Sequence, residues 1–289
     1  METYRLFHIG IPKSGTTSVQ QTLQNDPRLH VSRSRFFTGK EWWTLNRPEL
    51  PSNKICVESN ETLLSGGFQK VKFQQVLARL FQTNPDAHIV ITMRRQPEAL
   101  VSMFKYHIKY NFFGTKTLQH WLYQTNLGMD YLSCCFYGEI AKTVLGYFPK
   151  QQIHFLFFEE LKLDPINFYT KLYKVIGVEL KEEYLLKTVS NKMMLSEDAL
   201  YTLAKLNRYS VSKKNSEGFM GVQKGASLRL KLKTKAACTI SLQTPKGFFD
   251  LSNVEGYERL YADFKRSNNT LSELGFVPIS VLEKYNYPC

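Results

Sequence analysis

The 289-residue sequence has few of the features that mark metal-bound, disulfide-linked or membrane-spanning proteins. Its five cysteines have no spacing typical of a metal site, and their odd number favours reduced thiols over a disulfide framework. No apolar segment approaches the length of about 18 residues that a bilayer-spanning helix requires. Residues 1–5 lead directly into an apolar segment without the pattern of a secretory signal, so we expect a cytoplasmic protein.

Acidic residues are also scarce relative to basic ones. The chain has 38 Lys and Arg against 25 Asp and Glu, which gives a formal net charge of +13. Such an excess predicts anionic ligands: nucleotide phosphates, acidic glycans, nucleic acid or a membrane surface. Segment 201–235 alone holds nine basic residues and one acid, Glu217. It is either a solvated surface loop or a positively charged rim over an anion site.

The apolar pattern predicts strands that alternate with helices. Short segments rich in apolar residues at 5–9, 54–58, 88–93 and 152–158 predict buried strands, and helical spacing follows them. The segment at 88–93 is continuously apolar, which is typical of a central parallel strand covered on both faces. This alternation implies right-handed crossovers. We therefore predict an α/β fold with three α/β/α layers around a central, mainly parallel, P-loop-like sheet.

The pattern weakens in the second half of the chain. Segment 190–250 is basic and less regular, and the alternation in residues 228–233 predicts a half-exposed strand or hairpin. Residues 255–274 predict a last helix. We interpret residues 1–289 as a single domain that contains this segment.

The most informative motif is the loop of residues 10–17, Gly-Ile-Pro-Lys-Ser-Gly-Thr-Thr, between the first strand and a helical pattern. Strand, loop and helix N-terminus together direct backbone N–H groups and the helix dipole toward one anion. The loop departs from the common G-x-x-x-x-G-K-[ST] pattern, because its lysine is Lys13 and Thr16 occupies the usual lysine position. It is therefore not an ordinary nucleoside triphosphatase loop.

Two arginines follow the strand at 88–93. Arg94 and Arg95 lie where open α/β sheets bind ligands, and Ser102 comes eight residues after Arg94 on the next predicted helix. An arginine fork with a nearby hydroxyl suits a terminal phosphate, although such a pair can equally bond helix ends or neighbouring carboxylates. A P-loop kinase would need a magnesium-binding carboxylate at such a position, where this chain has arginines.

Together these residues resemble the PAPS-dependent sulfotransferases, which use 3′-phosphoadenosine 5′-phosphosulfate. Residues 11–17 resemble the family's 5′-phosphosulfate loop, and Arg94, Pro97 and Ser102 resemble its 3′-phosphate motif. The Arg-Arg-Gln stretch and residues 59–63 are most similar to bacterial-type carbohydrate sulfotransferases. Pro97 follows Arg94 by three residues rather than two, so either arginine could bind the phosphate, and the spacing to Ser102 favours Arg94.

The resemblance implies transfer of a sulfuryl group from PAPS to an acceptor hydroxyl, with PAP as product and no metal required. The expected acceptor is a hydroxyl of a carbohydrate or glycoconjugate. Nucleic acid is not an expected partner, whereas contact with a membrane surface remains an open alternative. The sequence does not indicate an oligomeric state. Lys13 would stabilise the charge of the leaving group. The Gly-rich lysine motif of cytosolic members is absent, and Lys213, Lys214 or Lys224 could replace it. The implied donor-binding residues are Pro12, Lys13, Ser14, Gly15, Thr16, Thr17, Arg94, Arg95 and Ser102.

The acceptor hydroxyl also needs a proton acceptor. The strand at 54–58 should end beside the loop, and we favour Glu61 over Glu58 as the base, with Glu41 and His107 as weaker candidates. Each glutamate can equally be an ordinary surface or helix-capping acid. Two other interpretations remain: a P-loop kinase of a small metabolite, and a non-catalytic module that binds acidic glycans or nucleic acid.

Overall fold

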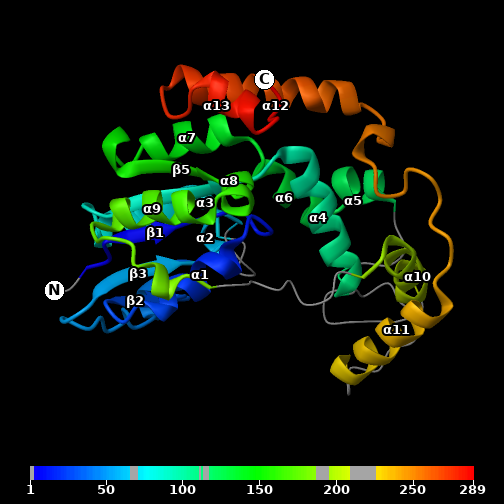
Figure 1. Cartoon of the computed structure of the whole chain (residues 1–289), viewed down its shortest axis with the longest axis horizontal. Coiled ribbons are helices and arrows are strands. Elements are labelled where there is room, and N and C mark those ends of the chain that lie inside the picture. Colours follow the sequence, from blue (N-terminus) through cyan, green and yellow to red (C-terminus); the bar gives the residue numbers. More distant parts are fainter. Residues whose placement is uncertain (1–2, 66–70, 111, 113–116, 187–194, 209–225) are drawn as a thin grey trace. The chain divides into compact units, whose positions relative to one another are not determined.

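The computed structural model describes residues 3–65, 71–110, 112, 117–186, 195–208 and 226–289, with side chains from residue 230 onward in the last range (Figure 1). By its internal contacts the chain forms two compact units. The first comprises Met1–Gln96, Ser133–Val189 and Tyr261–Cys289, and the second comprises Pro97–Leu132 and Ser190–Leu260.

The first unit contains a five-stranded parallel sheet with the order β2-β3-β1-β4-β5. Since β1 is central, the segment after it emerges between the carboxyl ends of β3 and β4, where parallel sheets bind ligands. The strands are β1 (Leu6–His8), β2 (Leu29–Ser32), β3 (Ile55–Ser59), β4 (His88–Met93) and β5 (Ile153–Phe157).

One face of the sheet packs against α1 (Thr16–Asn25), α8 (Phe158–Leu163) and α9 (Pro165–Ile176). Alternate strand residues, Leu6 and Leu156 among them, join Leu23 of α1 and Phe168 of α9 in one buried cluster. Burial of these side chains stabilises the layer by about 1.5–3 kcal/mol each.

The opposite face packs against α3 (Phe73–Thr83) and the C-terminal helices. Phe7 contacts Phe37 with ring centroids 5.2 Å apart, and Arg79 of α3 donates to the Phe37 carbonyl at 2.9 Å. Phe155 and Phe157 of β5 contact Phe276 and Tyr285. Helices therefore cover both faces, and the predicted α/β/α fold with a parallel sheet is confirmed.

The other elements of the first unit are α2 (Thr62–Ser65), α7 (Tyr137–Leu145), α13 (Ile279–Lys284) and the 3-10 turns η1 (Trp42–Thr44), η3 (Lys150–Gln152) and η4 (Glu182–Tyr184). The helix expected at 255–274 is α12 (Tyr257–Glu273).

The second unit is helical in its described part. Its described elements are α4 (Gln96–Lys109), α5 (Leu118–Gln124), α6 (Asn126–Ser133), α10 (Glu197–Asn207), α11 (Ala226–Ile240) and η5 (Leu251–Asn253). Trp121 is buried and donates from Nε1 to His107 Nδ1 at 2.9 Å, which joins α5 to α4. Asn207 donates to the Ile108 carbonyl and accepts from Lys233, which joins α10 to α4 and α11.

The strand predicted at 228–233 is wrong, because these residues belong to α11. Leu, Arg and Lys are strong helix formers, and α11 packs against α10 instead of pairing with a strand. Segment 190–250 therefore contains two helices. Lys213, Lys214 and Lys224 lie outside the described residues.

No helix in the described ranges is long and apolar enough to cross a membrane.

Histidine pairing in the sheet predicts a pH-dependent stability. His88 Nδ1 and His154 Nε2 are 2.9 Å apart, and burial lowers the pKa of both rings, that of His154 to about 4. The unfolded state then binds more protons between about pH 4 and 6.5, so the free energy of unfolding falls as the pH drops through this window. His154→Phe should reduce the slope by up to about 1.4 kcal/mol per pH unit. Denaturant titrations at several pH values measure this slope, and an unchanged slope would contradict the assignment.

Candidate active site

The loop between β1 and α1 contains two residues with positive φ, a backbone conformation that few residue types other than glycine adopt. Gly15 has φ +82°, and Lys13 has φ +72°, a left-handed conformation that costs a non-glycine residue about 1–2 kcal/mol. A Cβ at Gly10 would lie 2.8 Å from Thr16 Cγ2, and one at Gly15 would lie 2.7 Å from Leu161 Cδ2. The loop is therefore held in one shape by close packing.

This packing predicts the effect of Gly15→Ala. Alanine at this position would be strained by the left-handed backbone, and its methyl group would clash with Leu161. We therefore expect the free energy of unfolding to fall by about 2 kcal/mol or more. Gly256→Ala is a matched control, because Gly256 has φ +78° and open space around its Cβ position. Thermal unfolding of both variants measures the difference. Equal losses would contradict the close-packed loop.

The loop leaves the first turn of α1 open. The side chain of Ser14 is buried and donates to the Ile11 carbonyl at 2.6 Å, and Gly15 at the N-cap supplies no side-chain oxygen. Lys13 and Thr17 are exposed, whereas Thr16 is buried. The N-terminus of α1 is thus without a capping side chain and has a lysine beside it, an arrangement that fits an anion.

Arg94 lies against this loop. Its Nη1 donates to the Lys13 carbonyl at 2.7 Å, and its guanidinium carbon is 4.8 Å from the centroid of the Phe158 ring. Its backbone is fixed by the buried Tyr137, whose hydroxyl donates to the Arg94 carbonyl at 2.5 Å. The structure thus brings together Lys13 and Arg94, which are 81 residues apart in the sequence.

Arg95 has a different partner. Its backbone N–H donates to Glu159 Oε1 at 3.1 Å, its Nε lies 3.8 Å from the same oxygen, and the Tyr287 hydroxyl donates to Glu159 Oε2. The sequence allowed either arginine to bind a phosphate or to bond a neighbouring carboxylate. Arg95 bonds a carboxylate, that of Glu159. Ser102 is half-buried in α4 and belongs to the second unit.

Glu58 is enclosed at the end of β3. It has no exposed surface and accepts hydrogen bonds from the Ser32 hydroxyl, the Ser34 N–H at 2.7 Å and Asn60 Nδ2 at 3.3 Å. Burial raises the pKa of its carboxyl group to about 7. The oxygens of Glu58 are thus occupied within the protein.

Glu61 lies beside α1 and faces solvent. Its Oε1 forms an ion pair with Arg33 at 2.9 Å, its Oε2 accepts from Gln20 Nε2 at 3.2 Å, and a quarter of its side chain is exposed. Gln20 also donates to the Ser59 carbonyl, which fixes α1 to the end of β3. Nothing in the sequence pattern indicated the roles of Gln20 and Arg33.

The weaker base candidates are placed differently. His107 is buried in the second unit, accepts a hydrogen bond from Trp121 and stacks on Phe112 at 4.6 Å. Glu41 is exposed just before η1. His8 is buried at the end of β1 and hydrogen-bonded to Ser59 and Thr92, and burial lowers its pKa to about 4.

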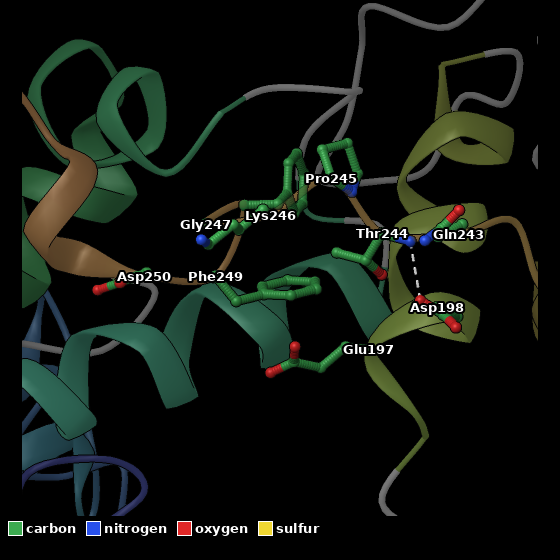
Figure 2. Close-up of a pocket in the computed structure, with 10 residues that line it drawn as sticks. Glu197, Asp198, Gln243, Thr244, Pro245, Lys246, Gly247, Phe249 and Asp250 are labelled. Atoms are coloured by element: carbon green, nitrogen blue, oxygen red, sulfur yellow. Dashed lines mark hydrogen bonds between the residues drawn. The ribbon is translucent and has the colours of Figure 1, made fainter.

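Two cavities lie elsewhere. One, of about 430 Å³, is in the second unit, where Glu197 and Asp198 of α10 face segment 243–250 (Figure 2). Asp198 accepts from the Thr244 N–H at 2.8 Å. The other, of about 350 Å³, lies at the amino ends of β1, β3 and β4, at the sheet edge opposite the loop. Within the described ranges, no group of three or more His, Cys, Asp or Glu could hold a metal ion.

Comparison with known proteins identifies the family. Residues 4–229, more than half of the chain, match the model of the sulfotransferase domain. The chain therefore belongs to this family and is a sulfotransferase. No curated protein matches it significantly.

A solved bacterial sulfotransferase agrees in fold. The sulfotransferase from Alicyclobacillus acidocaldarius is 16% identical, with a TM-score of 0.53 over 72% of this chain and 94% of the other. A mouse sulfotransferase complexed with PAP is 14% identical, with a TM-score of 0.47 over 96% of this chain and 90% of the other.

Proposed function

We propose that this sulfotransferase uses PAPS as its donor and transfers the sulfuryl group to a hydroxyl of a carbohydrate or glycoconjugate. The contact between Arg94 and the Lys13 carbonyl carries the proposal, because it joins the two segments that would bind opposite ends of a bisphosphorylated adenosine. The open N-terminus of α1 and the close-packed glycines of the loop fit an anionic group there.

The donor supplies an activated sulfuryl group. Backbone N–H groups of residues 14–17 would bind its 5′-phosphate, with the Thr16 and Thr17 hydroxyls nearby. The ammonium group of Lys13 would stabilise negative charge as it develops on the leaving group. Arg94 would bind the 3′-phosphate, with Ser102 as the proposed hydroxyl donor. The pairing of Arg95 with Glu159 favours Arg94 over Arg95 for this role.

Glu61 is the proposed base for the acceptor hydroxyl. A base must reach its proton, and Glu61 is partly exposed whereas Glu58 is enclosed. The raised pKa of Glu58 would suit a base, but its oxygens already accept three hydrogen bonds. We therefore assign Glu58 to holding residues 32–34 beside β3, and Glu61 to proton transfer.

A carbohydrate acceptor is supported by the sequence. The Arg-Arg-Gln stretch and residues 59–63 resemble bacterial-type carbohydrate sulfotransferases.

The decisive experiment has two parts. Calorimetry with EDTA present should detect PAP binding, whereas binding only of ATP with magnesium would indicate a kinase instead. Transfer of labelled sulfate from PAPS to a panel of glycans, lipids and phenols then identifies the acceptor. Labelling of phenols or lipids without glycans would contradict the carbohydrate assignment.

A further inference from the structure

The ring of Phe158 lies where the loop, Arg94 and α8 meet. Phe158 begins α8 directly after β5, and its side chain packs against the core cluster of the sheet. The Arg94 guanidinium carbon is 4.8 Å from the ring centroid, and Lys162 Nζ is 4.9 Å from it. The same ring adjoins the loop, since a Cβ at Gly15 would lie 3.0 Å from Phe158 Cδ2. One aromatic ring therefore contacts two cations and the anion-binding loop.

In the part of the chain that the structure describes, no carboxylate pairs with either of these cations. The two acids that follow Phe158 are engaged elsewhere: Glu159 with Arg95, and Glu160 with Lys171 at 2.5 Å. Two like charges on one ring repel each other, and an anion between or beside them would remove this repulsion. The local charge distribution thus points to an anionic ligand at the ring.

We propose that Phe158 is a positioning residue for Arg94, and that Lys162 is an additional binding residue for the phosphate groups of a bisphosphorylated nucleotide. This inference rests on the proposed donor site at the Lys13 loop. A guanidinium that stacks on a ring keeps its edge N–H groups free to face oxygen atoms, and only one of its five N–H groups is used by the Lys13 carbonyl. Lys162 is exposed, and its flexible stem allows it to follow the ligand as a point charge.

The role of Phe158 is tested by PAP affinity, measured by calorimetry. Phe158→Leu keeps an apolar side chain but removes the cation–π contact, so PAP binding should weaken about tenfold. Phe158→Tyr retains the ring and should bind as the native protein does. In an Arg94→Gln background, Phe158→Leu should cost less than twofold, because its effect passes through Arg94. Native PAP affinity in Phe158→Leu, or a full additional loss in the Arg94→Gln background, would overturn the positioning role.

The role of Lys162 is tested with a matched lysine. Lys181 is also exposed and also lies over an aromatic ring, 6.0 Å from the centroid of Tyr184, in the same unit. Lys162→Gln should weaken PAP binding about fivefold at low salt and reduce the dependence of affinity on salt, whereas Lys181→Gln should change neither. Equal behaviour of the two variants would overturn the assignment of Lys162.

The failure of this inference differs from that of the proposed function. A native protein without PAP affinity overturns the donor site and this inference together. A native protein that binds PAP, with unchanged affinity in Phe158→Leu and Lys162→Gln, overturns only the inference. Should Phe158→Leu not fold, the comparison of Lys162→Gln with Lys181→Gln still tests the inference, because both lysines are exposed.

Discussion

Lys13→Ala is expected to lower the kcat of sulfuryl transfer on the order of 10²–10³-fold, because it removes a positive charge aimed at the developing charge of the leaving group. Lys13 is exposed, so its loss should leave the fold intact. Steady-state kinetics with PAPS, alongside thermal unfolding, measure both properties. Lys13→Ala replaces one non-glycine residue at φ +72° by another, so the backbone strain is unchanged and cannot account for a lost rate.

Two further variants sharpen this prediction. Lys40→Ala removes an exposed lysine of the same unit outside the loop and should retain native turnover. Lys13→Arg keeps the charge with a different geometry, and should retain more activity than Lys13→Ala. Full turnover in Lys13→Ala would refute the proposed role of this residue.

Glu61→Gln is expected to reduce kcat on the order of 10²–10⁴-fold, since a general base contributes about that much and an amide cannot accept the proton. PAP affinity should stay near the native value, because the base acts on the acceptor.

The control for this prediction is Glu58→Gln. The pKa of Glu58 is raised to about 7, so the enclosed carboxyl group is largely protonated below neutral pH and an amide resembles that state. We expect this variant to retain activity, with altered stability because the amide must meet the Ser34 N–H. An active Glu61→Gln beside an inactive Glu58→Gln would transfer the role of base to Glu58.

The sequence predicted the sheet and the loop with good accuracy because both are encoded locally. The strand expected at 88–93 is β4 with the same bounds, and its continuous apolar run reflects burial on both faces. Gly10 and Gly15 marked the loop, and the close contacts at their Cβ positions explain why glycine is needed there.

The sequence failed where local pattern and tertiary packing disagree. Residues 228–233 alternate with the period of a strand, yet they form part of α11, because their helix propensity and the contact with α10 outweigh the alternation. The neighbouring arginines gave a second ambiguity. The spacing to Ser102 favoured Arg94 as the phosphate ligand but did not exclude Arg95. Only the structure shows that Arg95 lies beside Glu159 and that Arg94 contacts the Lys13 carbonyl.

The sequence by itself determined that a lysine-bearing loop and an arginine-ended strand belong to one parallel sheet, because apolar runs, glycines and their spacing act over a few residues. Only the tertiary structure decided that Arg94 contacts this loop, that Glu61 is accessible while Glu58 is enclosed, and that the Phe158 ring lies against two cations. These properties depend on contacts between residues as far apart as Lys13 and Phe158, and no local pattern records such contacts.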